Sequence, residues 1–110
     1  MAKIRKKRIR WNPSPDPDVR GYRLYWTLLE GVNHNSAFVN VGDVTEVILP
    51  DNVPAFPLIA GEMEFGVTAV NQAGNESDMA VFSANVYFVP PGPPTNLRFE
   101  DIQQNFHKET

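Results

Sequence analysis

The sequence predicts an all-β fold, a sandwich of two antiparallel sheets. In residues 62–70, Met63, Phe65 and Val67 alternate with Glu64, Gly66 and Thr68, a period-two pattern that gives a strand one buried face. Ten prolines and seven glycines divide the 110 residues into short pieces, and no stretch has an apolar three-four spacing long enough for a stable helix. A chain of this length is one domain with a two-layer core.

The first strand is expected over residues 3–11. Its two faces would carry Lys7, Ile9 and Trp11 on one side, and Lys6, Arg8 and Arg10 on the other. Trp11 is expected to be the largest buried anchor. A stiff, exposed loop follows over residues 12–18, because three alternate prolines remove backbone donors and hold their neighbours extended.

The second strand is expected over residues 20–28. One face would carry Tyr22, Leu24 and Trp26, and the other Arg23 and Tyr25. A turn at 30–36 and a Gly42-Asp43 turn would then separate two further strands, at 37–41 and 45–49.

Residues 50–61 are irregular but rich in apolar side chains, so we expect a loop folded back over the core. The central strand 62–70 then ends at a turn in which Gly74 can take positive φ. A last strand over residues 79–89 completes a hairpin with the central strand.

The C-terminal part has two segments of different character. Pro90 to Pro94 is a semi-rigid polyproline II linker. Residues 95–102 alternate again, with Leu97 and Phe99 on one face, and predict a strand, whereas residues 103–110 form a polar tail. The expected organisation is therefore a sandwich over 1–89, a linker over 90–94, and a strand with its tail over 95–110.

Three stretches carry a family resemblance: Ile9-Arg10-Trp11-Asn12-Pro13, Val19-Arg20-Gly21-Tyr22-Arg23-Leu24-Tyr25-Trp26, and the run from Phe65 to Ser77. Together they resemble a fibronectin type III domain, an immunoglobulin-like sandwich. In the terms of that family they look like its B strand, C strand and F strand. The resemblance covers about residues 4–89 and implies a protein interaction module.

Two positions depart from the family pattern. Met63 stands where the family usually has the tyrosine of its tyrosine corner, so the segment 50–61 is expected to pack there instead. The family domain also opens with an A strand before its B strand, whereas this chain begins at B. Residues 93–101 resemble such an A strand, at the opposite end of the sequence. The predicted fold is thus a fibronectin type III-like sandwich with its N-terminal A strand absent and an A-like strand at the C-terminus.

An A-like strand at this end has three possible fates. Returning to its own domain means crossing the sandwich. The span from Phe88 to Thr95 reaches only about 22 Å at about 3.1 Å per residue, whereas a sandwich of eight- or nine-residue strands is about 30 Å tall. Completing the B-strand edge of another copy through Thr95, Leu97, Phe99 and Asp101 is easier, and would give a closed dimer or a head-to-tail chain. The third fate is the start of a second domain, or a loosely packed tail.

The residue types point away from catalysis. The chain has no cysteine, which excludes a disulfide framework and a thiol nucleophile. His34 and His107 have no metal-ligand partners at recognisable spacing, Asp16 and Asp18 look like turn residues, and Glu62 and Glu64 would share a solvated face. We therefore expect no catalytic, metal or cofactor site, and a non-enzymatic protein-protein interaction module. Its exposed loops at 12–18, 30–36 and 72–78 are candidate contact surfaces for an unidentified partner.

The basic N-terminus suggests an alternative function. Six of the ten basic residues fall in the first ten positions, and the rest of the chain is acidic. A strand of this kind could bind nucleic acid or an acidic polysaccharide through Lys3, Arg5, Lys6, Lys7, Arg8 and Arg10. We favour a structural role, because lysines on an edge strand prevent unwanted pairing and acidic neighbours can neutralise them.

The N-terminal residues contain no apolar leader, and no run is long enough to span a bilayer. The sequence as written therefore predicts a cytoplasmic protein that does not enter membranes. Export by another route stays open.

Overall fold

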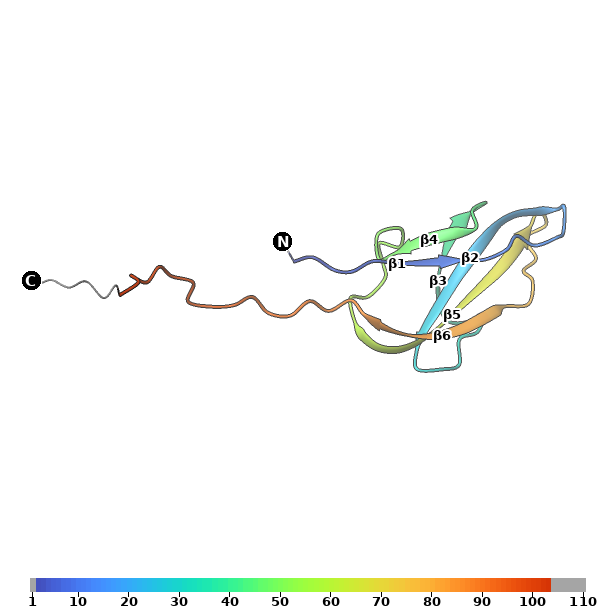
Figure 1. The fold of residues 1–110 in the computed structure, drawn as a ribbon. Helices are drawn as coiled ribbons and strands as arrows, with labels where there is room; N and C mark the ends of the chain where they lie inside the picture. The colour runs from blue at the N-terminus through green and yellow to red at the C-terminus, as the bar shows by residue number, and fades with distance from the viewer. Residues whose placement is uncertain (1, 104–110) are drawn as a thin grey trace, which may run out of the picture.

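The computed structural model describes residues 2–103 and contains six strands (Figure 1). They are β1 (Lys7–Arg10), β2 (Val19–Leu28), β3 (Ala37–Gly42), β4 (Glu46–Leu49), β5 (Ala60–Asn71) and β6 (Ala80–Tyr87). No residue in the described part of the chain is helical. Accordingly, residues 2–103 contain no helix with the length and apolar character needed to cross a membrane.

The strands form two antiparallel sheets, which confirms the all-β, two-sheet prediction. The larger sheet has the order β3-β2-β5-β6, and the smaller one pairs β1 with β4. The apolar core lies between them and draws on both sheets and on the loop after β4. Its buried members are Ile9, Leu24, Trp26, Val47, Leu49, Val53, Phe56, Met63, Phe65, Val86 and Phe88.

Strand register explains which side chains face this core. Leu24 lies opposite Val67, and Trp26 lies opposite Phe65, so the apolar rows of β2 and β5 coincide on one face of the larger sheet. Ile9 of the smaller sheet belongs to the same buried cluster. The alternation of apolar residues along β2 and β5 was therefore a correct guide to the buried face.

The segment between β4 and β5 folds back over the core, as predicted. Val53 and Phe56 are buried in it. The Phe56 ring centroid lies 5.4 Å from that of Trp26 and 5.6 Å from that of Phe88, distances typical of favourable aromatic pairs. This loop closes one end of the sandwich, where Met63 is also buried.

The first strand and Trp11 differ from expectation. Strand pairing covers only Lys7–Arg10, and Trp11 lies just beyond it, half-buried against Tyr22 at a ring-centroid distance of 5.7 Å. The larger buried anchors are Tyr25 and Trp26. The indole Nε1–H of Trp11 is buried, yet it meets no acceptor in the described part of the protein. Trp11 thus sits at a place where the packing is incomplete.

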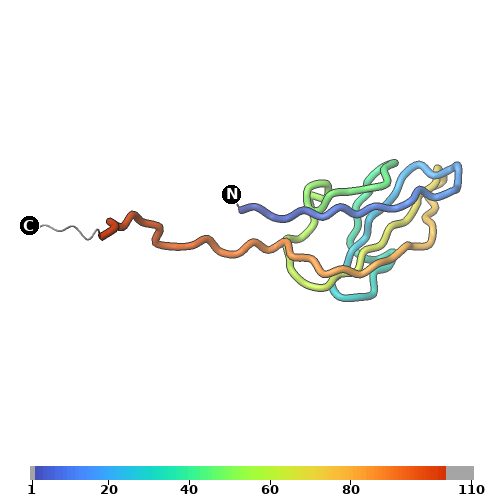
Figure 2. Tube along the Cα trace, in the orientation of Figure 1, coloured from blue at the N-terminus to red at the C-terminus, as the bar shows by residue number. Residues whose placement is uncertain are grey.

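The C-terminal segment also differs from expectation, because residues 95–102 form no strand within one chain. The trace leaves the sandwich after Phe88, whose N–H donates to the carbonyl of Ile59 at 2.8 Å, and continues away from the body (Figure 2). The radius of gyration is accordingly 23.1 Å, against about 13 Å for a compact domain of similar length. A strand needs a partner edge, and this segment reaches none. Of the predicted polar tail, residues 104–110 with His107 lie outside the described residues.

Candidate functional site

Both outer edges of the smaller sheet are unpaired within residues 2–103, and the one along β1 is the candidate site. β1 pairs with β4 through four residue pairs, from Lys7 opposite Leu49 to Arg10 opposite Glu46, and no other strand within residues 2–103 pairs with it. Neighbouring strands lie about 4.8 Å apart, so two strands cannot cover the inner face of four. The smaller sheet therefore leaves part of the inner face of the larger sheet uncovered, on the side beyond β1.

That uncovered surface includes Phe82, near the start of β6. Phe82 lies opposite the core residue Phe65, with ring centroids 5.4 Å apart, so both occupy the inner face. Phe82 is nevertheless 45% exposed, whereas Phe65 is buried. A hollow of about 150 Å³ continues this open region toward the end of β1; its lining includes Trp11, Tyr22, Val67 and Ala80.

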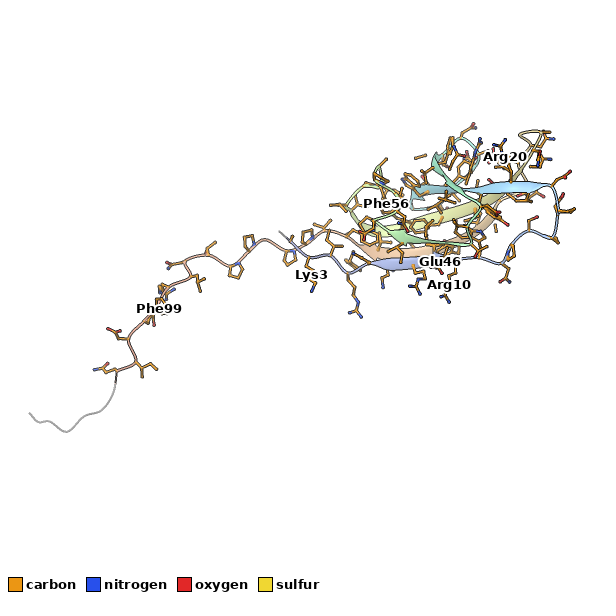
Figure 3. The ribbon with its side chains drawn as sticks, turned by 90° about the horizontal axis from the view of Figure 1, so that it is seen from above. Lys3, Arg10, Arg20, Glu46, Phe56 and Phe99 are labelled. Atoms are coloured by element: carbon orange, nitrogen blue, oxygen red, sulfur yellow. The ribbon has the colours of Figure 1, made fainter. Side chains whose placement is uncertain are left out.

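The four residues predicted to mediate self-association lie in the projecting C-terminal segment, far from this edge. Leu97 is 99% exposed and Phe99 is fully exposed, and Thr95 and Asp101 are exposed as well. Figure 3 shows Phe99 well away from the body. Among residues 2–103, the polar contacts of this segment are local: Arg98 contacts Glu100 at 2.8 Å and the Asn96 carbonyl at 2.9 Å. One chain therefore holds an open edge and an apolar strand-like segment that do not meet.

The six predicted anionic-polymer contacts divide into two groups. Lys6 pairs with Asp51 at 2.6 Å, and Arg8 and Arg10 pair with Glu46 at 3.7 and 3.2 Å. Lys3, Arg5 and Lys7 are exposed and make no ion pair within residues 2–103. Acidic neighbours thus occupy half of the set, and Lys7 of the other half belongs to β1 itself, whereas Lys3 precedes this strand (Figure 3).

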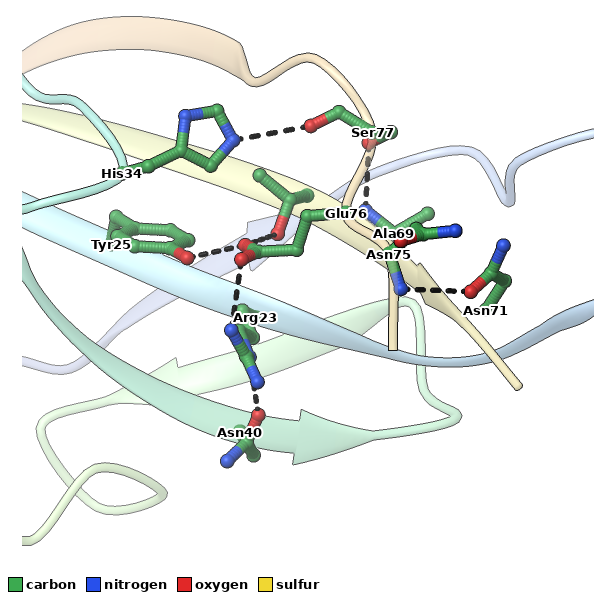
Figure 4. Close-up of polar contacts among 10 residues, drawn as sticks. Arg23, Tyr25, His34, Asn40, Ala69, Asn71, Asn75, Glu76 and Ser77 are labelled. Atoms are coloured by element: carbon green, nitrogen blue, oxygen red, sulfur yellow. Dashed lines mark hydrogen bonds and ion pairs between the residues drawn. The ribbon is translucent and has the colours of Figure 1, made fainter. Parts of the chain in front are cut away.

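A polar cluster on the outer face of the larger sheet was not predicted. The carboxylate of Glu76 accepts hydrogen bonds from Arg23 at 2.8 Å, from the Thr68 hydroxyl at 2.7 Å and from the Tyr25 hydroxyl (Figure 4). Tyr25 is buried although it points away from the core, because Phe38 and His34 pack against its ring. Glu76 therefore fastens the turn between β5 and β6 onto β2.

The cluster shifts the acidities of its members. Burial raises the pKa of Glu76, but hydrogen bonds from Tyr25 and Thr68 and the positive charge of Arg23 outweigh it, so this pKa is lowered overall. The pKa of Tyr25 is raised, first by burial and then by its hydrogen bond to the Glu76 carboxylate. The lowered pKa of Glu76 favours its ionised form, and the raised pKa of Tyr25 favours its neutral form.

The sequence offered only weak signals for this arrangement. Glu76 lies in the loop 72–78, which was expected to be exposed, and the register that aligns Arg23 with Thr68 cannot be read from either strand alone. Glu64 was likewise expected to be merely solvated. Instead it accepts from the N–H groups of Gly31 and Val32 at 2.8 and 2.9 Å, and these bonds lower its pKa.

Other predicted polar residues have simple structural roles. Asp16 accepts from the Asp18 N–H at 2.9 Å, as a turn residue does. His34 lies on the outer face, where its Nε2 is 3.2 Å from the Ser77 carbonyl oxygen. The described residues contain no group of three or more side chains able to hold a metal ion. Comparison with protein-family models, curated proteins and solved structures found no match.

Proposed function

We propose that the protein is a non-catalytic interaction module of fibronectin type III type that associates with itself by strand exchange. The strand order supports this family. β1 and β4 would be its B and E strands, and β3, β2, β5 and β6 its C′, C, F and G strands. The family places its A strand beside B, on the edge that β1 leaves open. The occupant we propose is residues 95–101 of another copy.

The observation that carries the proposal is the match between an incomplete sandwich and an unused strand. The acceptor offers the free edge of β1 and the exposed Phe82, and the donor offers Leu97 and Phe99 on one face. A strand added beside β1 would hydrogen-bond to its open edge and place these two side chains toward the exposed Phe82 of β6. Burying each would contribute about 1.5–3 kcal/mol, which ordering of the segment and association partly offset.

The test compares the solution mass of the full chain with that of a chain ending at Val89, by light scattering over a range of concentrations. All strand pairs and the buried core lie before Val89, so the shorter chain keeps them. We expect association in the full chain and a monomer in the shorter one. A full chain that stays monomeric at every concentration would refute self-association.

A full-length variant separates strand exchange from other causes of association. Leu97→Asp with Phe99→Asp keeps the chain length but makes both inward-facing donor positions unsuitable for an apolar face. We expect this variant to behave like the truncated chain. The control is Leu58→Asp, which adds a charge at a 52% exposed loop position of the body and should leave association unchanged.

A second candidate function rests on Lys3, Arg5 and Lys7, three exposed cations of the N-terminal segment that make no ion pair within residues 2–103. They could bind an acidic polymer such as nucleic acid or a sulfated polysaccharide. Replacing all three with glutamine should then weaken binding and flatten its salt dependence, whose slope on duplex DNA is about −0.9 per phosphate neutralised. Equal binding by the variant and the unchanged chain would remove this candidate.

A further inference from the structure

We infer that the assembly is an open head-to-tail chain of copies all pointing the same way, in which each donor segment lies antiparallel to β1 of the next copy. This inference rests on the strand exchange proposed above and adds its polarity, which is the direction of the donor strand relative to β1. Polarity decides the architecture, because the same donor and edge can close a dimer or extend a chain.

Charge complementarity favours the antiparallel arrangement. The acidic residues of the donor, Glu100 and Asp101, lie at its end, and the unpaired cations Arg5 and Lys7 lie at the start of the β1 region. Antiparallel pairing brings these two ends together. If Leu97 or Phe99 lies opposite Ile9, Asp101 falls opposite Arg5 or Lys7, respectively. Parallel pairing would instead place the donor acids opposite residues 10–13, where the one cation, Arg10, already pairs with Glu46.

Strand pairing elsewhere in the molecule also favours an antiparallel donor. Each strand pair among the described residues is antiparallel, and antiparallel ladders are slightly more stable per residue than parallel ones. Like charges along the basic edge also hinder β1 from pairing with β1 of another copy. The edge therefore accepts an acidic strand better than it accepts its own equivalent.

Because the donor is antiparallel to β1, the direction of β1 determines which way the copies point along the assembly. The N-terminal residues and the projecting segment lie at the same end of the molecule, and β1 runs from there toward the 12–18 loop (Figures 1 and 2). Ala2, Lys3 and the Pro90–Pro94 linker line one common hollow, which agrees with this placement. An antiparallel donor must therefore enter at the 12–18 end and run toward the end from which the acceptor's own segment leaves.

The linker then decides between an open chain and a closed dimer. Four of its five residues are proline, so it spans about 15 Å as an extended spacer at about 3.1 Å per residue. With a straight linker the next body lies ahead of the first, and its own segment points onward to a third copy. A closed antiparallel dimer would need both linkers to reverse direction. Parallel pairing, by contrast, would close a dimer with straight linkers.

The first experiment measures the mass of the full chain as its concentration rises. We expect masses that grow beyond the dimer, and shorter species when the chain ending at Val89 is added, because it accepts a strand but donates none. A dimer of constant mass that truncation converts to monomer would overturn the open chain and leave strand exchange standing. A monomer throughout would overturn both.

The second experiment reads the strand direction. Because the chain has no cysteine, single cysteines can report proximity by forming a disulfide under mild oxidation. Chains carrying Asp101→Cys are mixed with chains carrying Arg5→Cys or Lys7→Cys, which covers both registers. The matched control places the donor cysteine at Thr95, which only parallel pairing brings to those positions. Cross-linking through position 101 supports the inference; cross-linking through position 95, or through neither, overturns it.

Discussion

β6 and residues 95–101 are two segments with the same kind of sequence and different fates. Residues 82–86 of β6 and residues 96–100 both alternate apolar and polar side chains, and an irregular stretch precedes each segment. β6 pairs with β5 along its whole length because a tight turn returns it to an edge, whereas residues 95–101 leave the body on a proline-rich spacer. The difference teaches that an alternating pattern specifies a strand only together with an edge within reach.

The largest contrast between the two regions should appear on truncating a phenylalanine in each. Phe88, which directly follows β6, is fully buried, so Phe88→Ala should lower the free energy of unfolding by about 3–5 kcal/mol. Phe99→Ala removes a fully exposed ring and should change the stability of the monomer by less than about 0.5 kcal/mol. Urea denaturation at low protein concentration measures both.

Equal losses in that experiment would mean that Phe99 packs on its own body. The comparison between the two segments would then fail, together with the proposal that residues 95–101 are free for another copy. The result is independent of any assembly assay, because it concerns the monomer alone.

A smaller loss of stability is expected at the turn between β5 and β6, which brings β6 back beside β5. Glu76→Ala removes the acceptor of Arg23, Thr68 and Tyr25, and should cost about 2 kcal/mol because hydrogen bonds to a charged group contribute about 1.5–3 kcal/mol. Glu76→Gln keeps one acceptor oxygen and should cost less. A loss below about 0.5 kcal/mol for the alanine variant would show that the turn is held by its backbone bonds instead.

The same carboxylate predicts a pH dependence. Because the pKa of Glu76 is lower in the folded chain than its usual value, its stabilisation is present above the unfolded pKa and is lost as pH falls through the folded one. The stability of the unchanged protein should therefore fall as the pH drops below about 4.5. Unfolding curves of Glu76→Gln over the same pH range should show a shallower fall, and identical slopes would assign the acid sensitivity to other carboxylates.

The smallest effect on stability is expected for the ion pair between Lys6 and Asp51, beside the open edge of β1. Lys6 and Asp51 are about half exposed, so Lys6→Gln should change stability by about 0.2–1 kcal/mol, and added salt should abolish the difference. Thermal unfolding at low and high ionic strength measures it. A difference that persists in high salt would mean that Lys6 contributes through packing of its aliphatic stem.

Local patterns predicted most of the body, because each concerns a short range of sequence. Alternation identified the buried rows of β2 and β5, and the apolar content of residues 50–61 indicated that this segment covers the core. Gly74 takes a φ of 89°, as its turn was expected to require. These features follow from side-chain period and backbone sterics alone.

Features that depend on register or on neighbours escaped prediction. Tyr25 is buried on the outer face because β3 brings Phe38 beside it and the β5–β6 turn brings Glu76 over it, and no pattern within β2 contains this information. Trp11 is only half-buried because its strand ends before it and no further strand covers that side. For the candidate site, the sequence identified a strand-like segment without a partner, but only the three-dimensional arrangement reveals that Phe82 is exposed on the inner face.

β1 and the projecting segment lie along one axis and run in opposite directions (Figure 1), which has a mechanical consequence. A pull along the long axis of a head-to-tail chain of copies would load each donor along its own length, and the ladder hydrogen bonds lie across that direction. All bonds of one junction would therefore resist in shear together, rather than opening one after another as they do when a strand is peeled from its end. A linkage built from a few short strands would then withstand tension better than its small contact area suggests.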